Sequence, residues 1–416
     1  MKSLILYLLI LLLSCSGNKI NNTFKRSSVS DDSQSIILGL DVLFDEKINL
    51  IKNKDIALVT NQSGVDKEGR SNYLKFLEHE NVNLKVIFSP EHGLFGEAAA
   101  GEKLDYDELD DMPQVISLYG NKKRPSKKDL KDIDIIVYDV QDVGARFYTY
   151  ITTLGYVMEV ASQTKIKIIV LDRPNPLKGN LIEGPLLNMD YQSFVGNYPI
   201  PIRYGLSIGE LAKMMVGEKW IKGAPKLSVI KMKNWKRNQW YDETGLAWIK
   251  PSPNIPDLNT ALIYPGMCLL EATNINEGRG TEKPFKRFGA PWIDNARLSN
   301  RLNELKMPGV EFKPVTYIPT DIDGMAINPT FKNKICKGIE IKIIDRDIYQ
   351  SVQIGLNIIS ILRDEYPNKF KINDKRMISL LGVDELNIFN EMPIELKTIF
   401  SIRDFIETSK KYILYN

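Results

Sequence analysis

Short apolar runs alternate with longer stretches of helical periodicity through the first part of the chain. Five of these runs are almost continuously apolar, and each predicts a strand that is buried on both faces. They occupy residues 55–60, 84–89, 115–119, 134–140 and 166–171. Strands of this kind, separated by helical segments, are typical of a parallel sheet that helices cover on both sides.

Two helices stand out in the same part of the chain. The longer is predicted at 146–163, where apolar side chains from Phe147 to Ala161 recur on one stripe. The other is predicted to begin at Ser-Ile-Gly-Glu, because Ser207 and Glu210 have the spacing of a capping box. With the strands, these helices predict an α/β domain over residues 35–262.

The pattern changes after residue 262. The run 338–344 alternates isoleucine with charged residues, which predicts a strand with one face in water. We therefore expect residues 263–416 to form a second, smaller α+β domain. Its predicted helices lie at 296–305, at 348–363 and near 395–413.

The first 34 residues are expected to lie outside the fold. Residues 4–13 are apolar, which is typical of a signal peptide, and the run is too short to cross a bilayer of about 30 Å as a helix. It ends in LLLSC, which resembles the lipobox of bacterial lipoproteins, so Cys15 would carry the lipid. We expect residues 1–15 to be a lipoprotein signal peptide and residues 16–34 a flexible tether. The protein is then exported and lipid-anchored in the bacterial cell envelope, periplasmic or associated with the outer membrane.

The composition agrees with a globular chain of two domains. The 416 residues are 43% apolar and 26% charged, and single cores stop growing at roughly 250–300 residues. The 55 basic and 52 acidic residues leave a formal charge of +3, so no global field favours nucleic acid as a partner. The two histidines and three cysteines show no zinc-ligand spacing. An oxygen-liganded ion stays open, but we assign no metal and expect no cofactor.

Polar clusters follow four of the predicted strands. They are Asn61 and Gln62, Glu91 and His92, Asp139 and Asp142, and Asp172 and Arg173. The carboxyl ends of parallel strands share one edge of a sheet, and ligands bind in the crevice just outside that edge. We therefore predict an active or binding cleft there.

The chemistry of these clusters favours a sugar ligand. The sequence has no GxGxxG after a strand, no GxxxxGK[ST] and no GxSxG, which argues against a dinucleotide site, a P-loop and an α/β-hydrolase. Carboxylates, amides and arginines can hold a polyhydroxylated ligand, and a carboxylic acid can protonate a glycosidic oxygen.

Seven segments carry a family resemblance. They are TNQSGVD (60–66), FSPEHGLFG (88–96), DVQDVGARFYTYITTLGYVMEVA (139–161), LDRPNPLKG (171–179), EGPLL (183–187), SPNIP (252–256) and YPGMCLLEATNINEGRGTEKPF (264–285). These segments resemble the exo-β-N-acetylmuramidase family, whose members release N-acetylmuramic acid from the non-reducing end of peptidoglycan glycan fragments. The likeness spans residues 36 to about 370 and thins toward the C-terminus. It implies a Rossmann-like catalytic domain, a smaller auxiliary domain and an active site between them.

The resemblance implies roles for residues at the predicted edge. Glu91, in Pro-Glu-His-Gly, matches the family's proposed catalytic glutamate, and we expect it to be the general acid. His92 beside it would orient Glu91 or bind a hydroxyl group. A neighbouring carboxylate favours the protonated form of such an acid. The candidate neighbours are Asp142, which we count as catalytic, and Asp139, Asp172 and Glu277, which we count with the substrate site.

The implied sugar carries a lactyl carboxylate, so its pocket should contain a fixed cation. Arginine can bind a carboxylate through two parallel hydrogen bonds, and the candidates are Arg146, Arg173 and Arg279. We expect Arg146 to open a helix, where backbone amides would add to anion binding, with an ion pair to Asp142 as the alternative. The amide and hydroxyl partners expected for the sugar are Asn61, Gln62, Asn254 and Thr273.

Two other functions are weighed against the hydrolase. A non-catalytic envelope lipoprotein could hold a muramyl saccharide in the same cleft, although the intact Glu91 and His92 favour an enzyme. An esterase or amidase would need a nucleophile with an adjacent base, which these motifs lack. The expected partners are peptidoglycan fragments that contain N-acetylmuramyl-N-acetylglucosamine, and the membrane through the lipid anchor. Retaining, inverting and substrate-assisted mechanisms all remain open.

Overall fold

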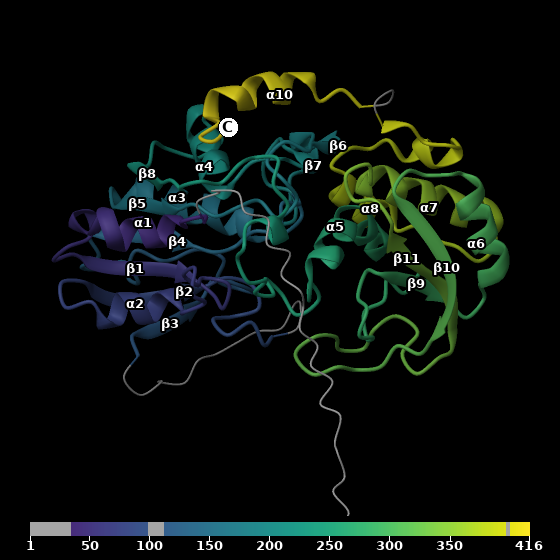
Figure 1. The fold of residues 1–416 in the computed structure, drawn as a ribbon, viewed down its shortest axis with the longest axis horizontal. Helices are drawn as coiled ribbons and strands as arrows, with labels where there is room; N and C mark the ends of the chain where they lie inside the picture. Colours follow the sequence, from purple (N-terminus) through teal and green to yellow (C-terminus); the bar gives the residue numbers. More distant parts are fainter. Residues whose placement is uncertain (1–34, 99–111, 397–399) are drawn as a thin grey trace, which may run out of the picture. The chain divides into compact units, whose positions relative to one another are not determined.

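Six parallel strands form the central sheet of the first half of the chain in the computed structural model, which describes residues 35–98, 112–396 and 400–416 (Figure 1). The strand order is β3-β2-β1-β4-β5-β8, and every neighbouring pair is parallel. The strands are β1 Asp55–Thr60, β2 Asn83–Ser89, β3 Gln114–Ser117, β4 Ile135–Asp139, β5 Lys167–Leu171 and β8 Leu227–Ile230. The five predicted strands are confirmed, and β8 adds an edge strand that the apolar pattern did not reveal.

Helices cover both faces of this sheet, as predicted. On one face, α3 (Tyr150–Thr164) and α4 (Ile208–Gly217) share a core with strand residues such as Val59 and Tyr138. On the other, α1 (Gly39–Glu46) and α2 (Asn72–Glu78) pack against alternate strand residues such as Leu58. The α/β class of this half is therefore confirmed.

The starts of α3 and α4 differ in how well the sequence predicted them. The capping box of α4 is confirmed, because the Ser207 hydroxyl accepts from the Glu210 amide and the Glu210 carboxylate accepts from the Ser207 amide. The predicted start of the longer helix at residue 146 is wrong, because α3 begins at Tyr150. The amide of Arg146 instead donates to the Ile202 carbonyl at 2.7 Å, which holds this backbone in an extended pairing.

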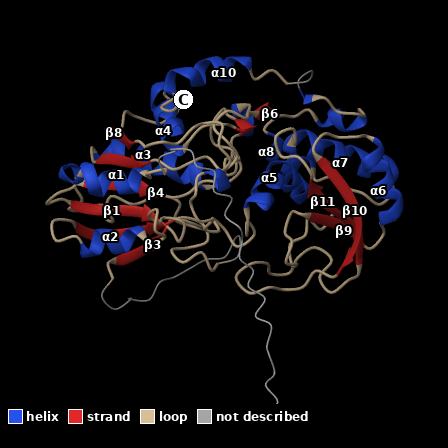
Figure 2. Cartoon of the chain, viewed as in Figure 1, coloured by secondary structure: helices blue, strands red, loops and turns tan. Residues whose placement is uncertain are grey.

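The second half contains a three-stranded antiparallel sheet in the order β10-β11-β9, which Figure 2 shows together with its helices. Its strands are β9 Arg287–Ala290, β10 Val310–Tyr317 and β11 Cys336–Ile343. The alternation predicted for 338–344 is confirmed, since Ile339 and Ile341 are buried while Lys337 and Lys342 face outward. The helices are α5 Leu258–Met267, α6 Asn295–Glu304, α7 Ser351–Glu365 and α8 Asp374–Leu381.

Shorter elements complete the described chain. A two-stranded antiparallel ribbon joins β6 (Glu183–Leu186) and β7 (Pro201–Arg203). Single 3₁₀ turns lie at Ile48–Leu50, Met189–Tyr191, Tyr241–Glu243, Cys268–Ala272, Leu386–Asn390 and Lys410–Tyr412. The final helix, α10, is Arg403–Ser409 and is shorter than predicted. Residues 397–399, which that prediction included, lie outside the described chain.

The described residues from Ser35 to Asn416 form one compact unit. The predicted boundary at 262/263 falls inside α5, and the division into two domains at that point stays a prediction. The predicted signal peptide, Cys15 and the tether lie outside the described residues. Among the helices that are described, none has both the length and the apolar character needed to cross a membrane.

Helices α5 and α7 approach each other closely through two glycines. A Cβ at Gly266 would lie only 2.0 Å from the Ser351 carbonyl oxygen, and a Cβ at Gly355 would lie 2.4 Å from the Gly266 oxygen. The Ser351 hydroxyl also accepts from the Gly266 amide at 3.0 Å. Glycine is therefore required at both positions, because a side chain at either would force α5 and α7 apart.

Candidate active site

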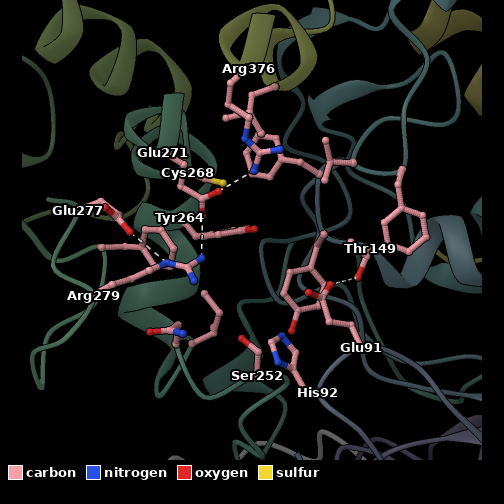
Figure 3. A pocket seen from close by; sticks show the side chains of 18 of the residues that line it. Glu91, His92, Thr149, Ser252, Tyr264, Cys268, Glu271, Glu277, Arg279 and Arg376 are labelled. Atoms are coloured by element: carbon pink, nitrogen blue, oxygen red, sulfur yellow. Dashed lines mark hydrogen bonds and ion pairs between the residues drawn. The ribbon is translucent and has the colours of Figure 1, made fainter. Parts of the chain in front are cut away.

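A cavity of about 460 Å³ lies where the loop after β2 meets the segments that follow α5 (Figure 3). Glu91, His92 and Thr149 come from the first half of the chain. Glu271, Glu277 and Arg279 come from the segment after α5, and Arg376 comes from α8. The cavity is therefore built from both halves, and its size suits a monosaccharide unit.

Glu91 and His92 lie on the turn that directly follows β2. Glu91 is half-buried, and the Thr149 hydroxyl donates to its Oε2 at 2.6 Å. His92 has a positive φ of 72°, and its Nδ1 lies 2.9 Å from the Ala98 carbonyl oxygen. Burial lowers the pKa of His92 despite the neighbouring Glu91, so the ring is neutral at pH 7. Since a carbonyl only accepts, Nδ1 carries the proton and Nε2 is left as an acceptor.

A carboxylate joins two arginines across the cavity. Glu271 accepts from Arg279 Nη2 at 2.7 Å through Oε1 and from Arg376 Nη2 at 2.8 Å through Oε2. Burial opposes ionisation of Glu271, but the two guanidinium groups outweigh burial and lower its pKa. Glu271 is therefore ionised, and it holds both guanidinium groups in fixed positions at the cavity wall. We call Arg279, Glu271 and Arg376 the arginine pair and its bridge.

Glu277 lies against Arg279 in a different protonation state from Glu271. Its Oε1 lies 3.1 Å from Arg279 Nε, yet burial raises the pKa of Glu277 to about 7, with Arg279 opposing and Glu271 adding to the rise. Near neutral pH, the cluster thus contains two guanidinium charges, one ionised carboxylate, Glu271, and one partly protonated carboxyl, Glu277. The cluster keeps a net positive charge, which suits an anionic ligand group.

Aromatic rings form the cavity wall around Tyr264. Its ring meets those of Phe147, Tyr148 and Phe285 edge to face, with centroids 5.4, 6.0 and 5.0 Å apart. The Arg279 guanidinium carbon lies 5.2 Å from the centroid of Phe285, within the range of a cation–π contact. These packed rings fix the cavity shape before any ligand binds.

Six of the predicted site residues line this cavity. They are Glu91, His92, Asn254, Thr273, Glu277 and Arg279. The Asn254 amide nitrogen donates to the Met325 carbonyl at 2.7 Å, while its Oδ1 is buried and accepts no hydrogen bond from the described residues. The Thr273 hydroxyl donates to the Leu270 carbonyl at 2.8 Å. The roles of these six residues stay predictions.

Arg173 and Asp139, predicted to bind substrate, instead bind each other at the sheet edge and do not line the cavity. Arg173 Nε and Nη2 lie 2.6 and 2.9 Å from the two oxygens of Asp139. Both side chains are buried, at 3% and 0% exposure. The Asn72 side-chain amide also donates to Asp139, and the Val65 carbonyl also accepts from Arg173. The pair uses its hydrogen-bonding groups internally, so we correct both assignments.

Asp142 and Asp172 are also buried outside the cavity lining. Asp142 accepts from Tyr204 and from the Gly144 amide, and burial raises its pKa to about 7. Asp172 accepts from the Ser207 hydroxyl and the Gly209 amide at 2.7 and 2.8 Å, and burial raises its pKa to about 6. Asp172 therefore secures the N-terminus of α4. The expected catalytic role of Asp142 and substrate role of Asp172 do not fit these positions.

Arg146 binds backbone carbonyls and neither opens a helix nor pairs with Asp142. Its Nη1 donates to the carbonyls of Pro185 and Ile200, each at 2.8 Å. Its Nη2 donates to those of Leu380 and Leu381 at 2.8 and 2.5 Å. The last two carbonyls end α8, the helix that carries Arg376. Arg146 is thus a C-terminal cap of α8 and not the predicted carboxylate ligand.

Asn61 and Gln62 secure the loops behind Glu91. The Asn61 amide donates to the Tyr150 hydroxyl at 2.8 Å, and that hydroxyl donates to the Pro251 carbonyl at 2.6 Å. The Gln62 amide donates to the Lys250 carbonyl at 2.8 Å. Neither residue lines the Glu91 cavity, although Gln62 lines a separate cavity, and their assignment as sugar ligands stays a prediction.

Sequence reasoning missed Glu271, Arg376, Thr149 and Ser252 among the cavity residues. Glu271 lies within the matching segment 264–285, where a carboxylate eight residues before Arg279 gave no spacing signal. Arg376 lies beyond the matching region, on a short amphipathic helix whose polar side would be assigned to solvent. Only the fold brings α8 next to the 3₁₀ turn at Cys268–Ala272.

One acidic cluster in the described part of the chain could hold a cation. It consists of Asp41, Asp66 and Glu68. The Lys75 ammonium lies 3.5 Å from Asp41 and 3.1 Å from Asp66, so a protein cation already neutralises this cluster. It is not part of the cavity.

Comparisons with known proteins cover both halves of the chain. The family model "Exo-beta-N-acetylmuramidase NamZ, N-terminal" matches residues 56–259, and the corresponding C-terminal model matches residues 262–415. The peptidoglycan beta-N-acetylmuramidase NamZ of Bacillus subtilis (strain 168) is 38% identical over 415 residues, which cover 96% of this chain and 98% of the relative.

Solved structures show the same fold. Two proteins of Bacteroides fragilis NCTC 9343, each described as a DUF1343 family protein, superpose with TM-scores of 0.81 and 0.73. They are 33% and 32% identical to this chain, and each match covers 92% of this chain and 99% of the other. The two family models and the Bacillus relative agree over nearly the whole folded unit, and the chain therefore belongs to the NamZ family of exo-β-N-acetylmuramidases.

Proposed function

We propose that this protein is an exo-acting glycoside hydrolase that releases N-acetylmuramic acid from the non-reducing end of peptidoglycan-derived glycans. One observation carries the proposal: a carboxylic acid, Glu91, and a bridged pair of arginines line the same cavity. The first supplies an acid for a glycosidic oxygen, and the second supplies cations for a carboxylate on the sugar. The name of the Bacillus relative supports the same substrate.

Glu91 is proposed as the general acid. The Thr149 hydroxyl donates to Oε2, so the transferable proton would reside on Oε1. His92 offers its neutral Nε2 as a hydroxyl acceptor beside Glu91. This arrangement can protonate the leaving oxygen while the sugar is held from its other side.

Arg279 and Arg376 are proposed to bind the lactyl carboxylate of the sugar. Glu271 fixes both guanidinium groups but cannot neutralise both. In Figure 3, Glu277 and Arg279 lie on the opposite side of the cavity from Glu91 and Thr149. A muramyl unit between them would present its carboxylate to one side and its glycosidic bond to the other.

The proposed location is the bacterial cell envelope. Residues 1–15 have the pattern of a lipoprotein signal peptide that ends at Cys15. Metabolic labelling of the expressed full chain with an alkyne fatty acid tests this proposal. Label that is incorporated in the natural chain and lost in Cys15→Ser supports the anchor, and equal labelling of both chains contradicts it.

The test of the hydrolase compares a chromogenic β-N-acetylmuramide with the matching N-acetylglucosaminide. We expect turnover of the muramide, and Glu91→Gln should lower kcat by about 10²-fold or more. Exposed Glu80 offers a matched control, and Glu80→Gln should leave kcat unchanged. A Glu91→Gln variant with full activity would remove Glu91 as the acid.

The same assay tests the arginine pair. Arg376→Met should raise KM for the muramide by about tenfold or more, while the KM of an analogue without the lactyl group should not change. An equal rise for both substrates would contradict carboxylate binding. Tight binding of the muramide by the natural chain without any turnover would favour the non-catalytic lipoprotein.

A further inference from the structure

The Thr149 side chain does not cap the helix that it precedes. Thr149 is the N-cap residue of α3, where a threonine hydroxyl commonly accepts from a backbone amide of the first turn. Thr149 makes no such bond. Its hydroxyl donates to Glu91 Oε2 at 2.6 Å, across the wall of the cavity (Figure 3). Among the described residues, Glu91 is the only hydrogen-bond partner of this hydroxyl.

Helix α3 gives Thr149 a fixed base. The Thr149 carbonyl accepts from the Thr153 amide at 3.0 Å and from the Thr153 hydroxyl at 3.3 Å. In the next turn, Leu154 and Val157 are fully buried in the core that α3 shares with the sheet. Threonine is also branched at Cβ, which restricts its χ1 angle. The Thr149 hydroxyl is therefore held by the fold independently of Glu91.

The Glu91 carboxylate has less support from its own turn. His92 and Gly93, which follow it, have φ values of +72° and +78°. The bond between His92 and the Ala98 carbonyl fixes the neighbouring ring and not the carboxylate. A glutamate side chain has several rotatable bonds, so holding it in one orientation costs conformational entropy. Among the described residues, Thr149 is the only hydrogen-bond donor to this carboxylate.

The bond makes the two oxygens of Glu91 unequal. A threonine hydroxyl has one proton to donate, and here that proton goes to Oε2. A proton on Oε2 would require the Thr149 hydroxyl to donate elsewhere, and the described residues offer it no second acceptor. A general acid must also have its proton within hydrogen-bond reach of the leaving oxygen. Thr149 thus selects Oε1 as the oxygen that delivers the proton.

We propose that Thr149 is a positioning residue that holds the Glu91 carboxyl so that Oε1 carries the proton to the leaving oxygen. This inference rests on the proposed function, in which Glu91 is the general acid. It makes the effect of Thr149 depend on the leaving group. An alkoxide leaves only with a proton, whereas a dinitrophenolate leaves without one. The loss of the Thr149 hydroxyl should therefore slow only those substrates that need the acid.

The experiment measures Thr149→Val, which removes the hydroxyl and keeps the branched shape, on methyl and 2,4-dinitrophenyl β-N-acetylmuramide. We expect kcat/KM for the methyl glycoside to fall about tenfold, with KM unchanged. The dinitrophenyl glycoside should change by less than about twofold. Thr149→Ser keeps the donor and should recover most of the loss.

The same substitution at the other end of α3 is the matched control. The Thr164 hydroxyl donates to the Val160 carbonyl at 2.8 Å, and Thr164 does not line the cavity. Thr164→Val should leave kcat/KM for both glycosides unchanged. It separates the loss of a helix hydroxyl from the loss of the donor to Glu91.

Three results would overturn the role of Thr149. An equal loss on both glycosides would show that Thr149 supports the fold or sugar binding, and no loss on the methyl glycoside would show that Glu91 needs no orientation. Equal losses in Thr149→Val and Thr149→Ser would show that the hydroxyl is not responsible. Failure of the proposed function looks different: the natural chain would hydrolyse neither glycoside, or Glu91→Gln would keep full activity on the methyl glycoside, and the role of Thr149 would fall with it.

Discussion

Glu277 connects the charge of the arginine pair to pH. The ordinary pKa of glutamate is about 4.3, but burial raises the pKa of Glu277 to about 7 in the folded protein. Below pH 7 the protonated carboxyl leaves Arg279 free to attract an anion. Above pH 7 the ionised carboxylate, 3.1 Å from Arg279 Nε, competes with the anion. Binding of a carboxylate substrate is therefore linked to proton uptake by Glu277.

We predict that KM for a β-N-acetylmuramide rises by about threefold to tenfold between pH 6 and pH 8.5. The Glu277→Gln variant should keep the low KM across this range, because it cannot ionise. The lactyl carboxylate stays ionised throughout, and burial lowers the pKa of His92, which reduces the contribution of His92 to any change of KM in this range. Initial rates at six or more pH values would measure the slope of KM against pH. An unchanged slope in Glu277→Gln would assign the effect to another group.

At the residue scale, the sequence predicted the Pro-Glu-His-Gly turn and Arg279, because these lie in long matching segments. It could not separate them from Asp139, Asp172 and Arg173, which follow strands in the same way. Polar residues at strand ends serve two purposes, since some bind ligands and others hold the loops of that edge together. Only the observed partners, such as the ion pair between Asp139 and Arg173, distinguish the two.

The element that matters most for the cavity is α8, because it carries Arg376 from the C-terminal part of the chain. Its last turn ends against Arg146, whose guanidinium binds the carbonyls of Leu380 and Leu381. A Cβ at Gly382, with φ +79°, would lie 2.7 Å from that guanidinium. Arg146 thus positions Arg376 without contacting the cavity itself.

Arg146→Met should lower the free energy of unfolding by about 2–4 kcal/mol, because it leaves buried carbonyls without donors. It should also raise KM for the muramide relative to an analogue without the lactyl group, because α8 and Arg376 lose their fixed position. Arg146→Lys should recover part of both losses. Denaturant unfolding and the KM ratio would measure the two effects. The exposed Arg363 on α7 is the control, and Arg363→Met should change neither quantity.

Strongly periodic elements were predictable at the element scale, and short ones were not. The five buried strands and the capping box of α4 follow from local patterns. The edge strand β8 and the ribbon of β6 and β7 each have three or four residues, too few to show a period. The start of α3 was misplaced because a tertiary hydrogen bond, from the Arg146 amide to Ile202, overrides the apolar stripe.

Across the whole molecule, the end of the chain returns to the first half (Figure 1). The Tyr415 hydroxyl donates to Asp172 at 2.5 Å and accepts from the Met232 amide at 3.0 Å. Its ring packs edge to face on Trp235, with centroids 5.0 Å apart. The Leu414 amide donates to Glu210 at 2.8 Å. The last residues therefore belong to the structure around α4 and β8.

We predict that Tyr415→Phe lowers the free energy of unfolding by about 1–3 kcal/mol, with a larger loss at pH 8 than at pH 5. Burial raises the pKa of Asp172 to about 6, and the Tyr415 hydroxyl opposes this rise. Above pH 6 the carboxylate is ionised, so loss of its donor costs most there. Urea unfolding at both pH values would measure the difference. Tyr412→Phe, which removes a bond to the more exposed Glu218, should cost less.

The position of Tyr415 also bears on the order of events during synthesis. Its ring belongs to the core between the sheet and α1, together with Ile230, Met232 and Trp235. A ribosome finishes the six strands of that sheet at Ile230, long before it reaches residue 415. The first half therefore leaves the ribosome before Tyr415 can cover this part of its core, and these packing contacts form only after residue 415 has emerged.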